Sequence, residues 1–256
     1  MADGRLGAGI RLAVTTFTVL PVPAGRIDRA TAGVAMAVAP AVGALLGVVL
    51  GGALVGLSAA AAPALLAGAV VVALGALLTR GLHLDGLADT VDGLGSYRDR
   101  AGALEIMKKP DVGPFGVAAL VLVLLVQAAA LAELARRSPG AALAAVVVAT
   151  ATGRLAVTWA CRRGVPAARP DGMGALVAGT VGRPALAVAT AAVVLAAVAA
   201  VPARPWQGPA AVLAALAVAV LLVAHSVRRL GGVTGDVLGA AVEAGTTVAY
   251  AGLVLG

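Results

Sequence analysis

Residues 115–135 read FGVAALVLVLLVQAAALAELA and contain a single charged side chain, Glu133. An α-helix rises about 1.5 Å per residue, so a stretch of this length reaches across the roughly 30 Å hydrocarbon core of a bilayer. Basic pairs flank the stretch, with Lys108 and Lys109 before it and Arg136 and Arg137 after it. The segment is therefore predicted to be a membrane-spanning helix.

The rest of the chain has the same character. Of its 256 residues, 61% are hydrophobic and 12% are charged, whereas a soluble domain carries about 25% charged residues. The mean hydropathy is +1.03, which is too much apolar surface for one water-soluble core. The predicted fold is an all-α, polytopic membrane bundle of about seven spans, with residues 1–256 forming one membrane-embedded domain. The further spans are predicted at 33–56, 62–79, 141–161, 184–203, 209–227 and 237–255.

The basic residues favour one orientation of this bundle. With the N-terminus inside, 15 of the 19 Lys and Arg residues fall on the inner side and 3 on the outer side. Because Lys and Arg accumulate in cytoplasmic loops, the N-terminus is predicted to be cytoplasmic. Three polar, glycine-rich segments, 80–114, 162–183 and 228–236, then share that face and can build one site. The stretch 12–23 is too short to span, and it is expected at the interface or as a re-entrant segment.

Carboxylates are concentrated in the first of these segments. Asp85, Asp89 and Asp92 lie in GLHLDGLADTVDG, residues 81–93, at spacing i, i+4 and i+7. On a helix this spacing places all three on one stripe, where like charges repel by roughly a few tenths of a kcal/mol per pair. Since the chain has only 12 acidic residues, the clustering favours a bound cation. Mg²⁺ is the natural candidate, because one or two carboxylates plus phosphate usually hold it. The alternative is a solvated helix cap with excess acids.

A basic run follows the stripe. Residues 106–116 read IMKKPDVGPFG. Lys108, Lys109 and the backbone at Gly113 can present positive charge and N–H groups to phosphate oxygens. The alternative for the two lysines is an anchor at the membrane surface.

Two further polar turns carry candidate substrate contacts. Residues 169–174 read RPDGMG and include Arg169 and Asp171, while the turn before the last predicted span includes Thr234 and Asp236. Each turn alone is also typical of an ordinary loop. An aspartate at the entrance to a span is costly to keep, so Asp236 is predicted to face a cation or a substrate hydroxyl rather than only to cap a helix.

Three ionisable residues stand apart from these turns. His83 precedes the carboxylate stripe and could shuttle a proton, contact substrate or simply pack at the interface. Glu243 falls inside the last predicted span and needs a buried partner there, for which Arg154 is a candidate. That pair is interpreted as structural rather than catalytic.

Four motifs occurring in one order resemble a known family, the adenosylcobinamide-GDP ribazoletransferases or cobalamin synthases. They are GLHLDGLADTVDGLG at 81–95, IMKKPDVGPFG at 106–116, RPDGMG at 169–174 and GGVTGDVLGA at 231–240, and TFTVLPVP at 16–23 is similar to the family's opening. One departure is Lys109-Pro110-Asp111, where the family often has Asp-Ser-Arg.

The resemblance implies a Mg²⁺-dependent transferase of the prokaryotic inner membrane with its active site facing the cytoplasm. It would join adenosylcobinamide-GDP to α-ribazole or its 5′-phosphate and release GMP. Asp85, Asp89 and Asp92 would hold the metal, and one of them or His83 would take the proton. The substrates would be bound by Lys108, Lys109, Gly113, Arg169, Asp171, Thr234 and Asp236.

Two other functions compete with this one. A CDP-alcohol-type membrane phosphotransferase also uses clustered aspartates, but its usual Ala-Arg pair and further Asp pair are not found. A secondary transporter would place ionisable residues near the bilayer midplane, whereas most here fall in predicted loops. The chain also lacks the features of a soluble nucleic-acid-binding module, and its small-residue-rich spans would permit a homo-oligomer.

Overall fold

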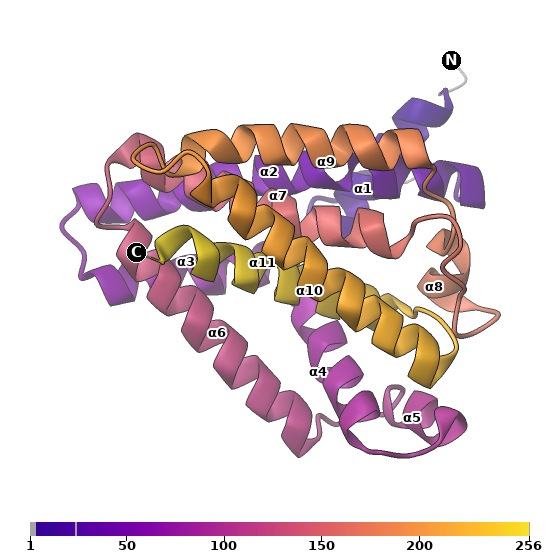
Figure 1. The fold of residues 1–256 in the computed structure, drawn as a ribbon. Coiled ribbons are helices and arrows are strands. Elements are labelled where there is room, and N and C mark those ends of the chain that lie inside the picture. The colour runs from indigo at the N-terminus through magenta and orange to yellow at the C-terminus, as the bar shows by residue number, and fades with distance from the viewer. Residues whose placement is uncertain (1–3, 24, 256) are drawn as a thin grey trace.

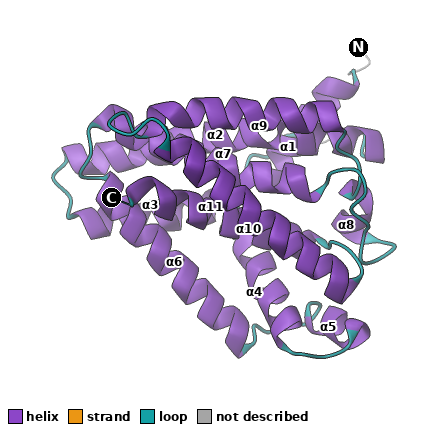
Figure 2. Ribbon diagram, viewed as in Figure 1, coloured by secondary structure: helices purple, strands orange, loops and turns teal. Residues whose placement is uncertain are grey.

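The computed structural model describes residues 4–23 and 25–255, which fold into helices joined by loops (Figures 1 and 2). Within these residues there are two isolated β-bridges and no strand. The α-helices are α1 (Arg5–Phe17), α2 (Arg29–Ala59), α3 (Ala64–Leu78), α4 (Leu82–Gly95), α5 (Arg100–Ile106), α6 (Pro114–Leu134), α7 (Pro139–Ala160), α8 (Gly172–Val177), α9 (Arg183–Ala197), α10 (Gln207–Leu230) and α11 (Gly235–Val254), and a 3₁₀ turn, η1 (Val198–Ala200), follows α9.

Within residues 4–23 and 25–255, six helical segments are long and apolar enough to cross a membrane: α2, α6, α7, α9 with η1, α10 and α11. Each coincides with one predicted span to within a few residues, so the prediction of a multi-pass helical membrane protein is confirmed. The side of the membrane on which the N-terminus lies stays a prediction.

The predicted span 62–79 needs correction. It corresponds to α3, which has 15 residues and is therefore only about 22 Å long, short of a bilayer core. The chain then turns by 91° into α4, through Arg80 and Gly81, which both adopt left-handed backbone angles with φ of 58° and 65°. A seventh span exists only if α3 and α4 are taken together as one bent unit, and the polar segment begins with a helix rather than a loop.

The segment near the N-terminus forms a helix that packs on the bundle. Helix α1 lies along α2, and the residues after it fasten to the α3–α4 turn. The Val19 N–H donates to the Leu78 carbonyl at 2.7 Å, and Arg80 Nη2 donates to the Thr15 carbonyl at 3.0 Å. These contacts hold the end of α1 beside the start of α4.

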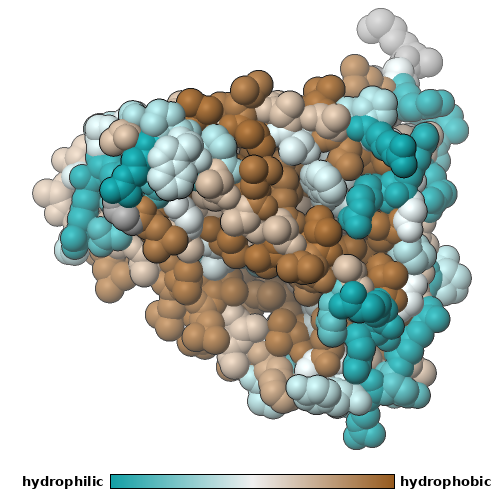
Figure 3. Space-filling view, viewed as in Figure 1, coloured by the Kyte–Doolittle hydropathy of each residue, from teal (hydrophilic) through white to brown (hydrophobic). Residues whose placement is uncertain are grey.

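Helix α7 is the centre of the bundle. Most of its side chains are buried, and its largest contact is with α2, where Thr158 Oγ1 donates to the Met36 carbonyl at 2.8 Å. Large apolar side chains such as Leu122 and Leu125 of α6 instead point outward and are exposed. Figure 3 shows hydrophobic side chains across the middle of the visible face, with hydrophilic ones gathered toward its left and right sides. This pattern suits a surface that meets lipid.

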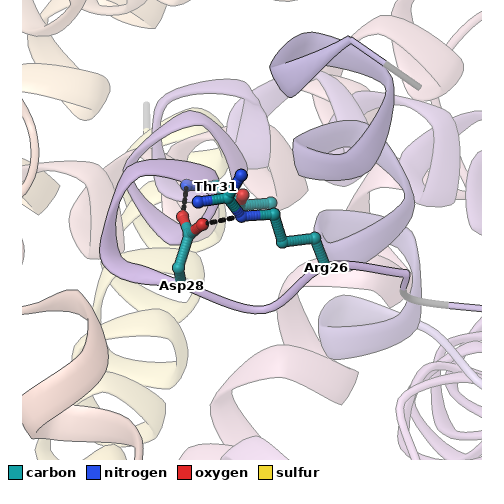
Figure 4. Close-up of polar contacts among 3 residues, drawn as sticks. All are labelled: Arg26, Asp28 and Thr31. Atoms are coloured by element: carbon teal, nitrogen blue, oxygen red, sulfur yellow. Dashed lines mark hydrogen bonds and ion pairs between the residues drawn. The ribbon is translucent and has the colours of Figure 1, made fainter. Parts of the chain in front are cut away.

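The first spanning helix begins at a capped N-terminus (Figure 4). Asp28 Oδ1 accepts the Thr31 N–H at 2.8 Å, and its other oxygen pairs with Arg26 Nε. The hydrogen bond from Thr31 lowers the pKa of the Asp28 carboxyl below its ordinary value. An N-cap of this kind satisfies an N–H group that has no partner inside the helix, and so it fixes where α2 begins.

A polar network lies inside the bundle between α6, α7 and α11. Gln127 Nε2 donates to Glu243 Oε2 at 2.8 Å and to Thr247 Oγ1 at 2.9 Å, and Arg154 lies within electrostatic range of Glu243. The hydrogen-bond partner of Glu243 is therefore Gln127, while Arg154, the partner predicted from the sequence, lies close enough to attract it. They line a cavity of about 50 Å³, which has room for a few water molecules.

Candidate active site

The candidate site begins where α4 and α11 meet at their backbones. A Cβ added at Gly86 would lie 2.7 Å from the Asp236 carbonyl oxygen, and one added at Gly239 would lie 3.2 Å from the His83 Cα. Only glycine permits this approach. As a consequence, the carboxylate stripe of α4 (Leu82–Gly95) lies beside the first turn of α11 (Gly235–Val254), far along the sequence.

Gly86→Ala is expected to push α4 away from α11. Overpacking of this kind costs about 1–3 kcal/mol, and it would move the α4 carboxylates relative to Asp236, so turnover should fall together with the melting temperature. Thermal unfolding in detergent and product formation check the two effects. Gly140→Ala is the matched control, because a Cβ there meets nothing within 4 Å. Equal behaviour of the two variants would contradict the tight contact.

The acidic cluster consists of Asp85, Asp89 and Asp236. Asp89 is half-buried on α4, where the charges of Asp85, Asp236 and Asp92 repel its carboxylate and Arg169 attracts it. Arg169 also attracts Asp236, which in addition accepts a hydrogen bond from Thr234 Oγ1 at 3.1 Å. Negative charge thus outweighs positive charge at this place, and a bound cation would relieve the repulsion.

Asp92 has a different environment from the other two stripe residues. It is buried, and its Oδ2 and Oδ1 accept the N–H groups of Gly113 at 2.7 Å and Gly116 at 2.9 Å. These groups belong to the start of α6, where a carboxylate is favoured by free N–H groups and by the helix dipole. Asp92 therefore fixes the first turn of α6 against α4, and the Gly113 N–H predicted to contact phosphate is bonded to it.

Asp92→Ala is expected to destabilise the protein. It removes two hydrogen bonds to a charged group, and such bonds contribute about 1.5–3 kcal/mol each. A lowered melting temperature in detergent is the readout. Asp111→Ala, a change at an exposed residue of the same segment, serves as the control. Unchanged stability of Asp92→Ala with lost activity would instead indicate that Asp92 acts mainly as a metal ligand.

The three polar segments predicted to share one site do come together. The Ala168 N–H donates to the Val233 carbonyl at 3.0 Å, which joins segment 162–183 to segment 228–236. Arg100 Nη2 donates to the Ala168 carbonyl at 3.0 Å, and Arg169 Nη2 donates to the Leu104 carbonyl at 2.6 Å. These bonds tie α5 to the other two segments, and Figure 1 shows α5 and α8 toward the same side of the molecule.

The predicted substrate-binding residues divide into two groups. Thr234 is the N-cap of α11 and accepts the Val237 N–H at 3.2 Å, so it both starts that helix and holds Asp236. Lys108, Lys109 and Asp171 are exposed. Of these three, Lys109 lines a cavity of about 260 Å³ that also contains Asp89 and Asp92. We call this the Lys109 cavity.

A second cavity also borders helix α4. It measures about 210 Å³ and is lined by residues that include Phe17, Met36, His83, Asp85, Met173 and Asp236. We call it the His83 cavity. The His83 ring is buried and stacked on Phe17, with centroids 5.9 Å apart and planes 25° apart. Phe17, Met36 and Met173 were not predicted as site residues, because apolar side chains on separate helices give no sequence signal.

The donor set of the acidic cluster fits Mg²⁺, although it is not a closed cage. Among the described residues, no group of three or more His, Cys, Asp or Glu side chains is placed to hold a metal ion. Mg²⁺ usually takes only one or two carboxylates and completes its shell with water and phosphate. Asp85, Asp89 and Asp236 could supply such oxygens, whereas both oxygens of Asp92 already accept N–H groups.

Comparison with known proteins gives the family. The profile of cobalamin-5-phosphate synthases matches residues 9–254. The chain belongs to this family. A relative from Frankia casuarinae, named adenosylcobinamide-GDP ribazoletransferase, is 42% identical over 250 residues, which cover 91% of this chain and 89% of the relative. Relatives of the same name from Nocardioides sp. and Corynebacterium efficiens are 42% identical over 245 residues (94% and 97% covered) and 37% identical over 258 residues (97% and 93%). No solved structure matches the chain.

Membership of the cobalamin synthase family makes the chain a membrane-embedded enzyme of cobalamin biosynthesis. The resemblance inferred from the four sequence motifs is thereby confirmed. Family membership also favours this transferase over the two alternatives, a secondary transporter and a CDP-alcohol-type phosphotransferase.

Proposed function

We propose that the protein joins adenosylcobinamide-GDP to α-ribazole, or to its 5′-phosphate, and releases GMP. The observation that carries the proposal is the family match over residues 9–254, since relatives of similar length carry the name of that activity. The acidic cluster beside Arg169 supports it. In phosphoryl transfer the negative charge of the phosphate groups must be neutralised where the substrates meet, and a cation bound by the cluster, together with Arg169, could do this.

The proposed reaction is an in-line displacement at phosphorus. A ribose hydroxyl of the ribazole attacks the phosphorus attached to the cobinamide arm, a new P–O bond forms, and the bond to the GMP oxygen breaks. The hydroxyl proton passes to a carboxylate, for which half-buried Asp89 is the best placed. His83 is the alternative acceptor from the sequence, but its ring is buried against Phe17, which disfavours it as the group that takes the proton.

The remaining groups position the phosphates. Lys109 and Asp89 line the same cavity, so the lysine can meet phosphate oxygens next to the cluster. Lys108, its exposed neighbour in the chain, adds a second positive charge to the same segment. One or two carboxylates among Asp85, Asp89 and Asp236 would hold Mg²⁺ together with water and phosphate, and the metal would supply positive charge against the pyrophosphate and the departing GMP. We place this site on the cytoplasmic face of the inner membrane, because the three segments that build it carry most of the basic residues.

Metal removal provides a test. Protein purified in lipid and treated with EDTA is expected to lose GMP release, and added Mg²⁺ should restore it, whereas Ca²⁺, with its larger and more flexible coordination shell, should restore less. Full turnover in the presence of chelator would contradict the metal dependence but leave the transferase activity standing.

A further inference from the structure

The His83 cavity has an apolar floor and a charged mouth. Phe17, Met36, Val157 and Leu238 are buried at its wall. The ionisable residues that line it are His83, which is buried, Asp85, which is exposed, and Asp236, which is partly exposed. The exposed side of the cavity thus carries two members of the acidic cluster, Asp85 and Asp236, while its buried wall carries no carboxylate.

The size of this cavity limits what it can hold. Pockets that enclose drug-sized ligands measure roughly 300–1,000 Å³, and this one measures about 210 Å³. It has room for one flat ring system but not for a whole nucleotide or a corrin. The stacked rings of Phe17 and His83 offer an aromatic wall of the kind on which such a ring packs.

The polarity of the interior distinguishes between the two bases in the proposed reaction. Guanine carries several hydrogen-bond donors and acceptors around its edge, and burying them without partners is costly. The dimethylbenzimidazole of ribazole carries two methyl groups and one free ring nitrogen. His83 Nε2 is buried and has no hydrogen-bond partner within the described part of the chain, so a neutral imidazole could donate its N–H to that one nitrogen.

We infer that the His83 cavity binds the benzimidazole base of the ribazole substrate and thereby places its ribose at Asp85 and Asp236. The inference rests on the proposed function and adds the subsite that selects the second substrate. Phe17, His83 and Met173 are binding residues in this arrangement, and guanosine binds elsewhere.

Filling the mouth of the cavity tests the inference. Leu82 lines the cavity and is 44% exposed, so Leu82→Trp adds bulk there without disturbing the core. Leu77→Trp is the matched control, because Leu77 is 71% exposed and lies five residues away, and it does not line the cavity. We expect Leu82→Trp to raise the KM for α-ribazole 5′-phosphate about tenfold, with the KM for adenosylcobinamide-GDP changed less than twofold. His83→Phe should weaken ribazole binding as well.

Binding without turnover separates this inference from the proposed function. Equilibrium dialysis of α-ribazole against wild-type protein and both tryptophan variants, in the absence of the second substrate, should show a Kd raised about tenfold by Leu82→Trp alone. If the wild type releases GMP while Leu82→Trp binds ribazole normally, the transferase stands and the base subsite is wrong. A larger effect on adenosylcobinamide-GDP than on ribazole would also overturn it. Absence of GMP release by the wild type would reject the proposed function itself, and absence of ribazole binding would reject the subsite.

Discussion

Asp89→Asn is expected to lower turnover by about a thousandfold or more, which corresponds to about 4 kcal/mol of transition-state stabilisation. Asp89 lies on α4 among the charges of Asp85, Asp236 and Arg169. The amide of asparagine has nearly the same shape as the carboxylate, but it neither attracts a divalent cation as strongly nor accepts a proton at neutral pH. The variant should therefore insert and fold normally while losing GMP release.

The control for this change is Asp99→Asn. Asp99 caps α5 by accepting the Gly102 N–H at 3.0 Å, and it lines neither the Lys109 cavity nor the His83 cavity. Its variant should keep near-normal turnover. Normal turnover by Asp89→Asn, in protein that elutes as a single species, would remove Asp89 from the proposed chemistry.

Glu243→Leu is expected to destabilise the bundle by about 3–5 kcal/mol, because it leaves the buried charge of Arg154 without its counter-charge. Both residues lie inside the polar network of α6, α7 and α11, and Arg154 is buried. The double variant Arg154→Leu/Glu243→Leu should recover much of the loss, since it removes both charges. Thermal unfolding of the four proteins of this cycle in detergent measures the coupling.

Gln127→Leu separates hydrogen bonding from charge in the same network. It removes the bonds to Glu243 and Thr247 but no ionised group, so a smaller loss of about 1 kcal/mol is expected. If Arg154→Leu/Glu243→Leu is no more stable than Glu243→Leu, the charges of Arg154 and Glu243 do not stabilise each other.

The spans were predictable because each is a long apolar stretch, and a helix needs about 20 such residues to cross a bilayer. The bend after α3 was not predictable in the same way. It depends on Arg80 and Gly81 both adopting left-handed backbone angles, and the composition of the segment does not indicate that an arginine will adopt such angles. Helix α1 was missed as a helix because the predicted apolar stretch 12–23 begins only in its second half.

The candidate site was predictable in its residue types but not in its partners. The spacing of Asp85, Asp89 and Asp92 indicates one helix face, yet Asp92 bonds to N–H groups 21 and 24 residues further along the chain. Only the packed structure shows that both oxygens of this carboxylate accept backbone N–H groups, which distinguishes it from Asp85 and Asp89. Likewise, Gly86 and Gly239 indicate a close helix contact only once both helices are placed.

The most direct test of the central claim is turnover by the purified protein. The wild type in lipid, given adenosylcobinamide-GDP, α-ribazole 5′-phosphate and Mg²⁺, is expected to release GMP in a one-to-one ratio with adenosylcobalamin 5′-phosphate. A folded, metal-supplied sample that releases no GMP and forms no cobalamin product would contradict the account.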